Sequence, residues 1–113
     1  MLNLDPLHPT CPIRNILSRM SDKWSLLILR TLNRNGVMRY KDLNAAIPDI
    51  SQKMLSNTLK RLEEGKLINR KMYPEIPPRV EYSLTKTGQE LMPALTMMVN
   101  WALEHFEEIT ERV

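Results

Sequence analysis

The stretch from Ser51 to Arg70 constrains the fold most, because its hydrophobic pattern changes period in the middle. Over residues 51–64, apolar side chains recur at helical spacing and polar side chains occupy the opposite face. Gly65 stands where a helix end requires a positive φ, and a strand-like pattern follows it. The stretch therefore predicts an amphipathic helix followed by the first strand of a hairpin. The predicted apolar face consists of Met54, Leu55, Thr58, Leu59 and Leu62.

The polar face of this predicted helix carries side chains that suit contact with DNA. Lys53, Ser56, Asn57, Lys60 and Glu64 point away from the apolar stripe, and Gln52 and Arg61 lie on the flanks. Lysine, serine, asparagine and glutamine are residue types that reach phosphates and base edges in a major groove. A solvated surface helix is the alternative interpretation, and the helix alone does not decide between the two.

Two helices are predicted near the N-terminus, after an arm over residues 1–10. The first covers about residues 12–20, with Thr10 or Cys11 as its N-cap and Pro12 at its first turn. The second covers about residues 23–33, follows a cap at Ser21 or Asp22, and ends at a glycine. Its inward side chains are predicted to be Trp24, Leu26, Leu27, Ile28, Leu29 and Leu32.

A helix-turn-helix is predicted in the middle of the chain. Residues 41–47 form a two-turn helix in this interpretation, with Leu43, Ala46 and Ile47 inward, and Pro48 breaks it before Ser51 caps the longer helix. A short helix, a turn and a longer polar-fronted helix in succession are the helix-turn-helix arrangement. The segment 37–40 is a candidate strand that would pair with the later hairpin.

A hairpin over residues 67–84 is predicted directly behind the polar-fronted helix, where it would form a wing. The strands are residues 67–73 and 79–84, and Val80, Tyr82 and Leu84 alternate with polar residues in the second. The proline-rich connection over residues 74–78 cannot continue a ladder, so it forms the tip. The basic residues beside this tip are Arg70, Lys71 and Arg79.

A long helix over about residues 86–111 is predicted to end the fold, with Thr87 and Glu90 at capping-box spacing. Pro93 either bends its entry or delays its regular start. Its apolar side chains recur every three or four residues, and Trp101 is a type enriched at interfaces. The helix either folds back on its own domain or forms a dimer face, and we favour the dimer face because helix-turn-helix proteins bind as two-fold dimers.

Charge distribution also favours a nucleic-acid partner. The 113 residues carry a net charge of +3, but residues 1–85 hold 14 Lys and Arg against 8 Asp and Glu, and residues 86–113 hold 2 against 5. A basic body and an acidic C-terminal helix suit a protein whose nucleic-acid face lies apart from its assembly face.

The length fits one domain. No apolar run reaches the ~18–20 residues of a membrane span, no signal peptide is visible, and we expect a cytoplasmic protein.

Several motifs in order resemble the HxlR-type regulators, a winged-helix branch near the MarR-like proteins. The similarity covers about residues 11–105. It rests on Cys11-Pro12, on Lys23-Trp24-Ser25-Leu26-Leu27-Ile28-Leu29, on Ile50-Ser51-Gln52-Lys53-Met54-Leu55, on Pro77-Pro78-Arg79-Val80-Glu81-Tyr82-Ser83-Leu84-Thr85, on Thr87-Gly88 and on Met92-Pro93.

This resemblance implies a fold and a function. The fold is α+β and mostly helical, a winged helix-turn-helix over residues 11–113 with N- and C-terminal dimerisation helices. The function is that of a bacterial transcriptional regulator, a homodimeric repressor in our interpretation, bound to a two-fold-symmetric operator in double-stranded DNA. The implied DNA-binding residues are Ser51, Gln52, Lys53, Ser56, Asn57, Lys60 and Arg79, with Gln52 and Asn57 on base edges and Lys53, Lys60 and Arg79 on phosphate. The expected dimer interface includes Ile13, Leu17, Leu95, Met98, Trp101, Ala102 and Phe106.

Cys11, the single cysteine, matches the position at which members of such families sense oxidants or electrophiles. A helix N-terminus and nearby Arg14 would favour the reactive thiolate. Without a second cysteine in the chain, sensing requires a bridge between two Cys11 of a dimer or a small-thiol adduct. The alternative is a packed or exposed thiol without a role.

Two other function classes are weaker. A thiol enzyme would need Cys11 with His8 or His105, but no oxyanion signature accompanies them, the histidines lack metal-ligand spacing, and three glycines form no phosphate loop. We therefore expect no enzyme, metal or cofactor. A winged-helix module that binds protein would need an acidic or apolar recognition face, and the lysines argue against it. A small-molecule effector between the dimerisation helices and the DNA-binding core remains open.

Overall fold

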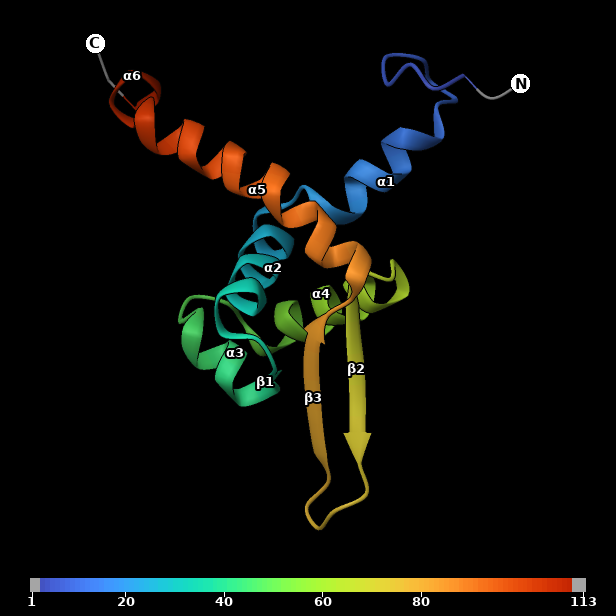
Figure 1. The fold of residues 1–113 in the computed structure, drawn as a ribbon, viewed down its shortest axis with the longest axis vertical. Helices are drawn as coiled ribbons and strands as arrows, with labels where there is room; N and C mark the ends of the chain where they lie inside the picture. The colour runs from blue at the N-terminus through green and yellow to red at the C-terminus, as the bar shows by residue number, and fades with distance from the viewer. Residues whose placement is uncertain (1–2, 111–113) are drawn as a thin grey trace.

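The computed structural model describes residues 3–110. Within them the helices are α1 (Pro12–Met20), α2 (Lys23–Asn35), α3 (Tyr40–Ala46), α4 (Gln52–Glu64), α5 (Lys86–Glu104) and α6 (Phe106–Thr110), and the strands are β1 (Met38–Arg39), β2 (Ile68–Tyr73) and β3 (Arg79–Leu84). Helices α2, α3 and α4 and the base of the sheet form the body (Figure 1). Helix α1 and the outer half of α5 diverge from one end of this body, and the β2–β3 hairpin extends from the other.

The three strands form one antiparallel sheet in the order β1–β3–β2. Strand β1 lies in the segment that is a candidate strand in the sequence, and it pairs with one edge of β3 through Met38 and Tyr82. Strand β2 pairs with the other edge of β3, where Arg70 is opposite Tyr82. The central strand β3 is paired along both edges, and five of its six residues are half-buried, so burial along β3 does not follow the alternation of apolar and polar residues in its sequence.

The hydrophobic core joins α2, α3, α4, the sheet and the first half of α5. Some side chains predicted to be inward lie at the surface instead: Leu27 is 37% exposed and Met54 38%, and Ala46 is exposed too. In these helices the buried stripe is therefore narrower than the apolar stripe in the sequence. The core cluster contains Ile28, Leu29, Leu32, Met38, Leu43, Ile47, Ile50, Leu55, Leu59, Leu62, Leu67, Ile68, Tyr82, Met92 and Leu95.

The end of α4 corrects one prediction about backbone geometry. Gly65 has φ −77°, and the positive φ of 62° belongs to Lys66. Lys66 N–H donates to Glu63 O and Leu67 N–H donates to Leu62 O, which is the Schellman arrangement with the left-handed residue one position after the cap. At the end of α2, by contrast, Gly36 does have a positive φ, of 78°.

Helix α5 differs from its prediction at both ends. Its N-cap is Thr85, whose Oγ1 accepts the N–H of Gly88 at 3.0 Å, so Thr87 and Glu90 do not form the predicted box. Pro93 lies inside the continuous helix. The helix ends at Glu104 with His105 as its C-cap, and α6 follows, so the predicted single helix over 86–111 is interrupted; residue 111 lies outside the described residues.

The described part of the N-terminal arm, residues 3–10, folds over the start of α1. Arg14 Nε donates to Pro6 O at 2.7 Å and Arg14 Nη2 donates to Leu7 O at 2.9 Å. Cys11 N–H donates to His8 O at 3.0 Å. Residues 1 and 2 of the predicted arm lie outside the described residues. None of the helices described is long and apolar enough to cross a membrane.

Candidate nucleic-acid interface

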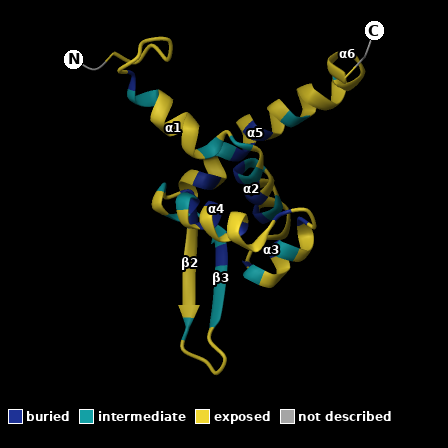
Figure 2. Ribbon diagram, turned by 180° about the vertical axis from the view of Figure 1, so that it is seen from behind, coloured by how far each residue is buried: buried dark blue, intermediate teal, exposed yellow. Residues whose placement is uncertain are grey.

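Helix α4 is held by its apolar side and presents its polar side to solvent. Ser51 caps it by accepting the N–H of Met54 at 3.0 Å, so the hydroxyl oxygen is committed to the helix end. Leu55, Leu59 and Leu62 are at most 2% exposed and fix the helix to the core. Figure 2 shows the outward side of α4 as exposed residues. The exposed polar side chains are those predicted to face DNA: Ser51, Gln52, Lys53, Ser56, Asn57 and Lys60.

Tyr40 connects α3 to the exposed side of α4. Its hydroxyl donates to Gln52 O at 3.0 Å and lies 3.2 Å from Ser56 Oγ. Lys53 and Lys60 form no ion pair with any residue in the range 3–110. Helix α4 therefore offers two ammonium groups, one near its start and one in its second half, beside the exposed amide side chains of Gln52 and Asn57. The sequence reasoning missed Tyr40, because its position twelve residues before Gln52 gave no sign of contact.

Arg61 anchors the back of α4 to the start of α2. Arg61 Nη2 lies 3.0 Å from Asp22 Oδ1 and 3.2 Å from Ser25 Oγ, and Ser25 is fully buried. Burial of the Asp22 carboxylate raises its pKa, but hydrogen bonds from Ser25 and the charge of Arg61 outweigh it, so the pKa lies below 3.8. The sequence placed Arg61 on the flank of the polar face. In the fold it sets the orientation of α4 on α2.

The wing carries Arg79 in a more neutralised setting than predicted. Arg79 Nη1 lies 3.4 Å from Glu75 and Nε 3.4 Å from Glu81, and its guanidinium stacks 4.1 Å from the centre of the Tyr73 ring. Lys71 Nζ lies 5.0 Å from the same ring. Two cations therefore flank one aromatic ring on the outer face of the hairpin, and the two carboxylates reduce the positive potential there.

Large apolar side chains remain exposed on α1, α5 and α6. Trp101 is 54% exposed, Phe106 60% and Leu17 45%, whereas Leu95, expected at a dimer interface, is 4% exposed and belongs to the core of its own chain. Ile13 is partly buried and Ala102 exposed. The exposed set on these helices consists of Ile16, Leu17, Met97, Met98, Trp101, Leu103, Phe106 and Ile109.

Cys11 is the N-cap of α1 and is 4% exposed. Arg14, expected to act on the thiol, instead uses its guanidinium to hold the carbonyl groups of Pro6 and Leu7. The thiol is therefore covered in this conformation. His8 and His105 belong to no group of three or more potential metal ligands within residues 3–110.

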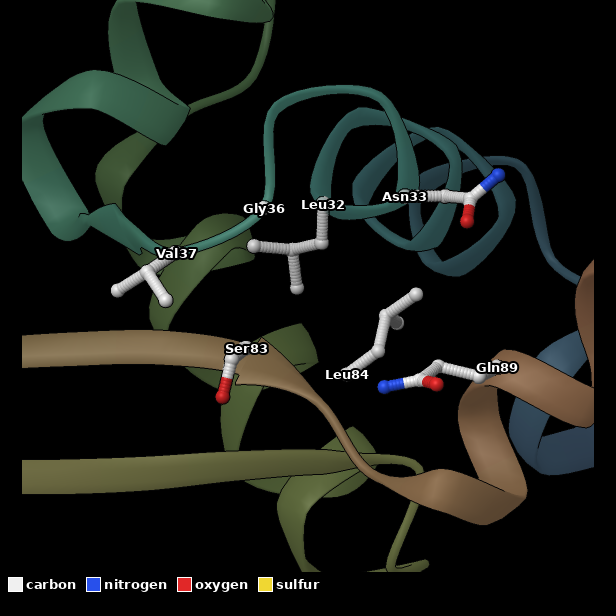
Figure 3. A pocket seen from close by; sticks show the side chains of 7 residues that line it. All are labelled: Leu32, Asn33, Gly36, Val37, Ser83, Leu84 and Gln89. Atoms are coloured by element: carbon white, nitrogen blue, oxygen red, sulfur yellow. The ribbon is translucent and has the colours of Figure 1, made fainter.

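Two cavities lie away from the exposed face of α4. One measures about 370 Å³ and lies between the end of α2, the end of β3 and the start of α5; Leu32 and Leu84 point toward each other across it, and Gln89 borders it (Figure 3). The other, about 190 Å³, is almost entirely apolar and lies between α1, α2 and α5, where Leu17, Met20 and Met98 contribute to its wall.

Comparison with known proteins identifies close relatives of this chain. The family model described as HxlR-like helix-turn-helix matches residues 19–110. An HTH-type transcriptional regulator of Methanothermobacter thermautotrophicus is 43% identical over 91 residues, which are 80% of this chain and 69% of that one. The solved structure of the transcriptional regulator YtfH from Salmonella typhimurium has a TM-score of 0.83, at 33% sequence identity and with 93% of each chain covered.

 

The redox regulator HypR in its oxidised form has a TM-score of 0.74 at 31% identity, and the match covers 91% of this chain and all of that one.

Proposed function

This chain belongs to the HxlR-like helix-turn-helix family of DNA-binding transcriptional regulators, and we propose that it acts as a homodimeric repressor on a two-fold-symmetric operator. The observation that carries the proposal is the exposed polar side of α4, with two lysines that form no ion pair with the described residues, on a helix whose other side is fixed in the core. In this proposal residues 11–113 form the functional domain. The protein works in the cytoplasm, where chromosomal DNA lies, and no catalytic step is proposed.

Helix α4 enters the major groove in this proposal. Gln52 and Asn57 contact base edges, because glutamine and asparagine pair with adenine there. Lys53, Lys60, Ser51 and Ser56 contact the backbone, and the N-terminus of the helix favours phosphate as well. Arg79 contacts a phosphate near the minor groove only if DNA displaces Glu75 or Glu81 from its guanidinium.

Dimerisation uses α1, the outer half of α5, and α6. Eight large apolar side chains on these helices are exposed, and large apolar patches on a protein surface mark interaction sites. The radius of gyration supports the same proposal: it is 16.3 Å, against about 13 Å for a compact chain of this length. Two copies that pack these projecting helices together would cover the surface and place two α4 helices on one face.

The DNA-binding test is a titration against the duplex upstream of the protein's own gene, with a random duplex as control, at several salt concentrations. We expect a preference for the upstream duplex, a two-fold-symmetric footprint, and a log–log salt slope of about −0.9 per phosphate contacted. Lys53→Ala should flatten this slope, and Gln52→Ala should relax discrimination at one base pair by about 1–3 kcal/mol. Equal losses on every duplex with Gln52→Ala would remove its base-reading role.

Repression and dimerisation have separate tests. Trp101→Glu should shift the protein from dimer to monomer in light scattering, whereas Met72→Glu, on an exposed wing residue, should leave the dimer intact. A transcription assay with the bound promoter should show fewer transcripts when the protein is added. More transcripts would make it an activator, and the DNA-binding assignment would stand.

We also propose that Cys11 responds to oxidants, because the similar structures include a protein described as a redox regulator. Because Cys11 is buried, the residues that cover its thiol have to move before it reacts. Oxidant should release wild-type protein from DNA and leave Cys11→Ser bound; equal release of both would refute the proposal.

A small-molecule effector would fit the apolar cavity between α1, α2 and α5, and thermal shift measurements with apolar ligands would detect it.

A further inference from the structure

A notch of about 320 Å³ lies between α4 and the sheet. Ser56, Lys60 and Glu63 line it from α4, at the four- and three-residue spacings that place side chains on one helix face. Arg70 lines it from β2, and Tyr40 from the start of α3. Leu59 and Tyr82 complete the lining.

The strand register directs Arg70 toward this notch. Arg70 pairs with Tyr82, which is 8% exposed and packs in the core, so both side chains leave the sheet on the face that meets α4. The next residue, Lys71, leaves the opposite face and lies near the Tyr73 ring. Arg70 is exposed and forms no ion pair with another residue between positions 3 and 110.

The donors that line the notch match a singly charged phosphate group. Lys60 and Arg70 supply two positive charges and Glu63 one negative charge, which leaves a net charge of +1. The Ser56 hydroxyl lies 3.2 Å from the Tyr40 hydroxyl, and Tyr40 also donates to Gln52 O. Tyr40 therefore holds Ser56 near the two cations, and arginine, lysine and serine are common phosphate contacts.

We propose that the notch binds a phosphate of the DNA strand that separates the major groove from the adjacent minor groove. This inference rests on the proposed function, with α4 in the major groove and the β2–β3 wing at the minor groove. A helix and a hairpin placed in neighbouring grooves straddle one sugar-phosphate strand, and the notch lies between them. Lys60, Arg70 and Ser56 contact the phosphate, and Tyr40 is a positioning residue.

The first test compares Arg70→Ala with Lys71→Ala on a random duplex over a series of salt concentrations. The two variants lose the same charge from adjacent residues on opposite faces of β2, so Lys71→Ala is the matched control. Arg70→Ala should weaken binding about tenfold and reduce the salt slope by about 0.9 per protomer, with a smaller effect in the control. Equal effects of the two variants would overturn the proposal.

A second variant should act in the opposite direction. Glu63→Gln removes the one carboxylate from the notch, so binding to any duplex should tighten several-fold if a phosphate lies there. Weaker or unchanged binding would contradict this placement. Tyr40→Phe keeps the ring and removes the hydroxyl, and it should weaken DNA binding without lowering the thermal midpoint of the free protein; a matching loss of stability would make its role structural.

Single neutral methylphosphonate substitutions in the bound duplex locate the phosphate. One position should weaken the wild-type protein and have no further effect on Arg70→Ala. If both proteins show the same profile, the notch proposal fails and DNA binding by α4 stands. If the wild-type protein binds no DNA at all, the proposed function itself fails.

Discussion

Replacement of Gly88 by alanine tests how closely α5 approaches the sheet. A Cβ at this position would lie 2.2 Å from Leu67 O and 3.4 Å from Leu84 Cδ2. Because ordinary carbon–oxygen contacts begin at about 3.3 Å, the start of α5 would have to move by roughly 1 Å. That movement acts on the junction where Thr85 N–H donates to Leu67 O at 3.0 Å and Thr85 Oγ1 donates to Lys66 O at 2.7 Å.

The net change in the free energy of unfolding of Gly88→Ala is the sum of a loss and a smaller gain. Weakening about three hydrogen bonds, including the Thr85 cap on Gly88, costs about 3 kcal/mol at ~1 kcal/mol each. Alanine recovers up to about 1 kcal/mol of helix propensity, so the net loss is about 2 kcal/mol, or a thermal midpoint lower by about 8 °C.

Urea and thermal unfolding followed by circular dichroism at a fixed protein concentration would measure this loss. Gly65→Ala is the matched control, because Gly65 has φ −77° and its nearest backbone oxygen would lie 3.3 Å from the new Cβ; we expect a change below about 1 kcal/mol. A Gly88→Ala protein as stable as the wild type, or more stable, would refute the close contact between α5 and Leu67.

Three further predictions concern stability. Thr58→Val should stabilise the protein by about 1 kcal/mol in urea unfolding, because Thr58 Oγ1 is buried without a hydrogen-bond partner among the described residues; destabilisation would contradict this prediction. Gly36→Ala should cost about 1–3 kcal/mol from backbone strain alone, because φ is 78° and nothing lies within 4 Å of the new Cβ, and a thermal midpoint equal to that of the wild type would disprove the strain. The pKa of Asp22 is lowered in the folded state, so its contribution to the free energy of unfolding is present above about pH 4 and is lost as the pH falls through the folded pKa. The stability of Asp22→Asn, measured by unfolding curves, should therefore depend less on pH below 4 than that of the wild type. An unchanged dependence would assign the acid sensitivity to other carboxylates.

Local sequence signals determined most of the secondary structure. Ser51 and Gly36 bound their helices as the capping rules predict, and the proline-rich tip separates β2 from β3. These features depend on residues a few positions apart, so a single sequence contains the information. The end of α4 is the exception, because the hydrogen bonds of Lys66 and Leu67, rather than the position of the glycine, determined where φ becomes positive.

The tertiary structure decided which residues share a surface. The sequence alone determined a winged helix-turn-helix pattern and a polar face on residues 51–64, because helical and strand periods are local properties. Only the fold placed Arg61 against Asp22, Tyr40 beside Ser56, and Arg70 across a notch from Lys60. It also buried Leu95 in its own core while leaving Trp101 exposed, although both were predicted at one dimer interface. Contacts between segments far apart in the chain depend on how the helices pack. The periodicity within one helix does not show which residues of another element will face it.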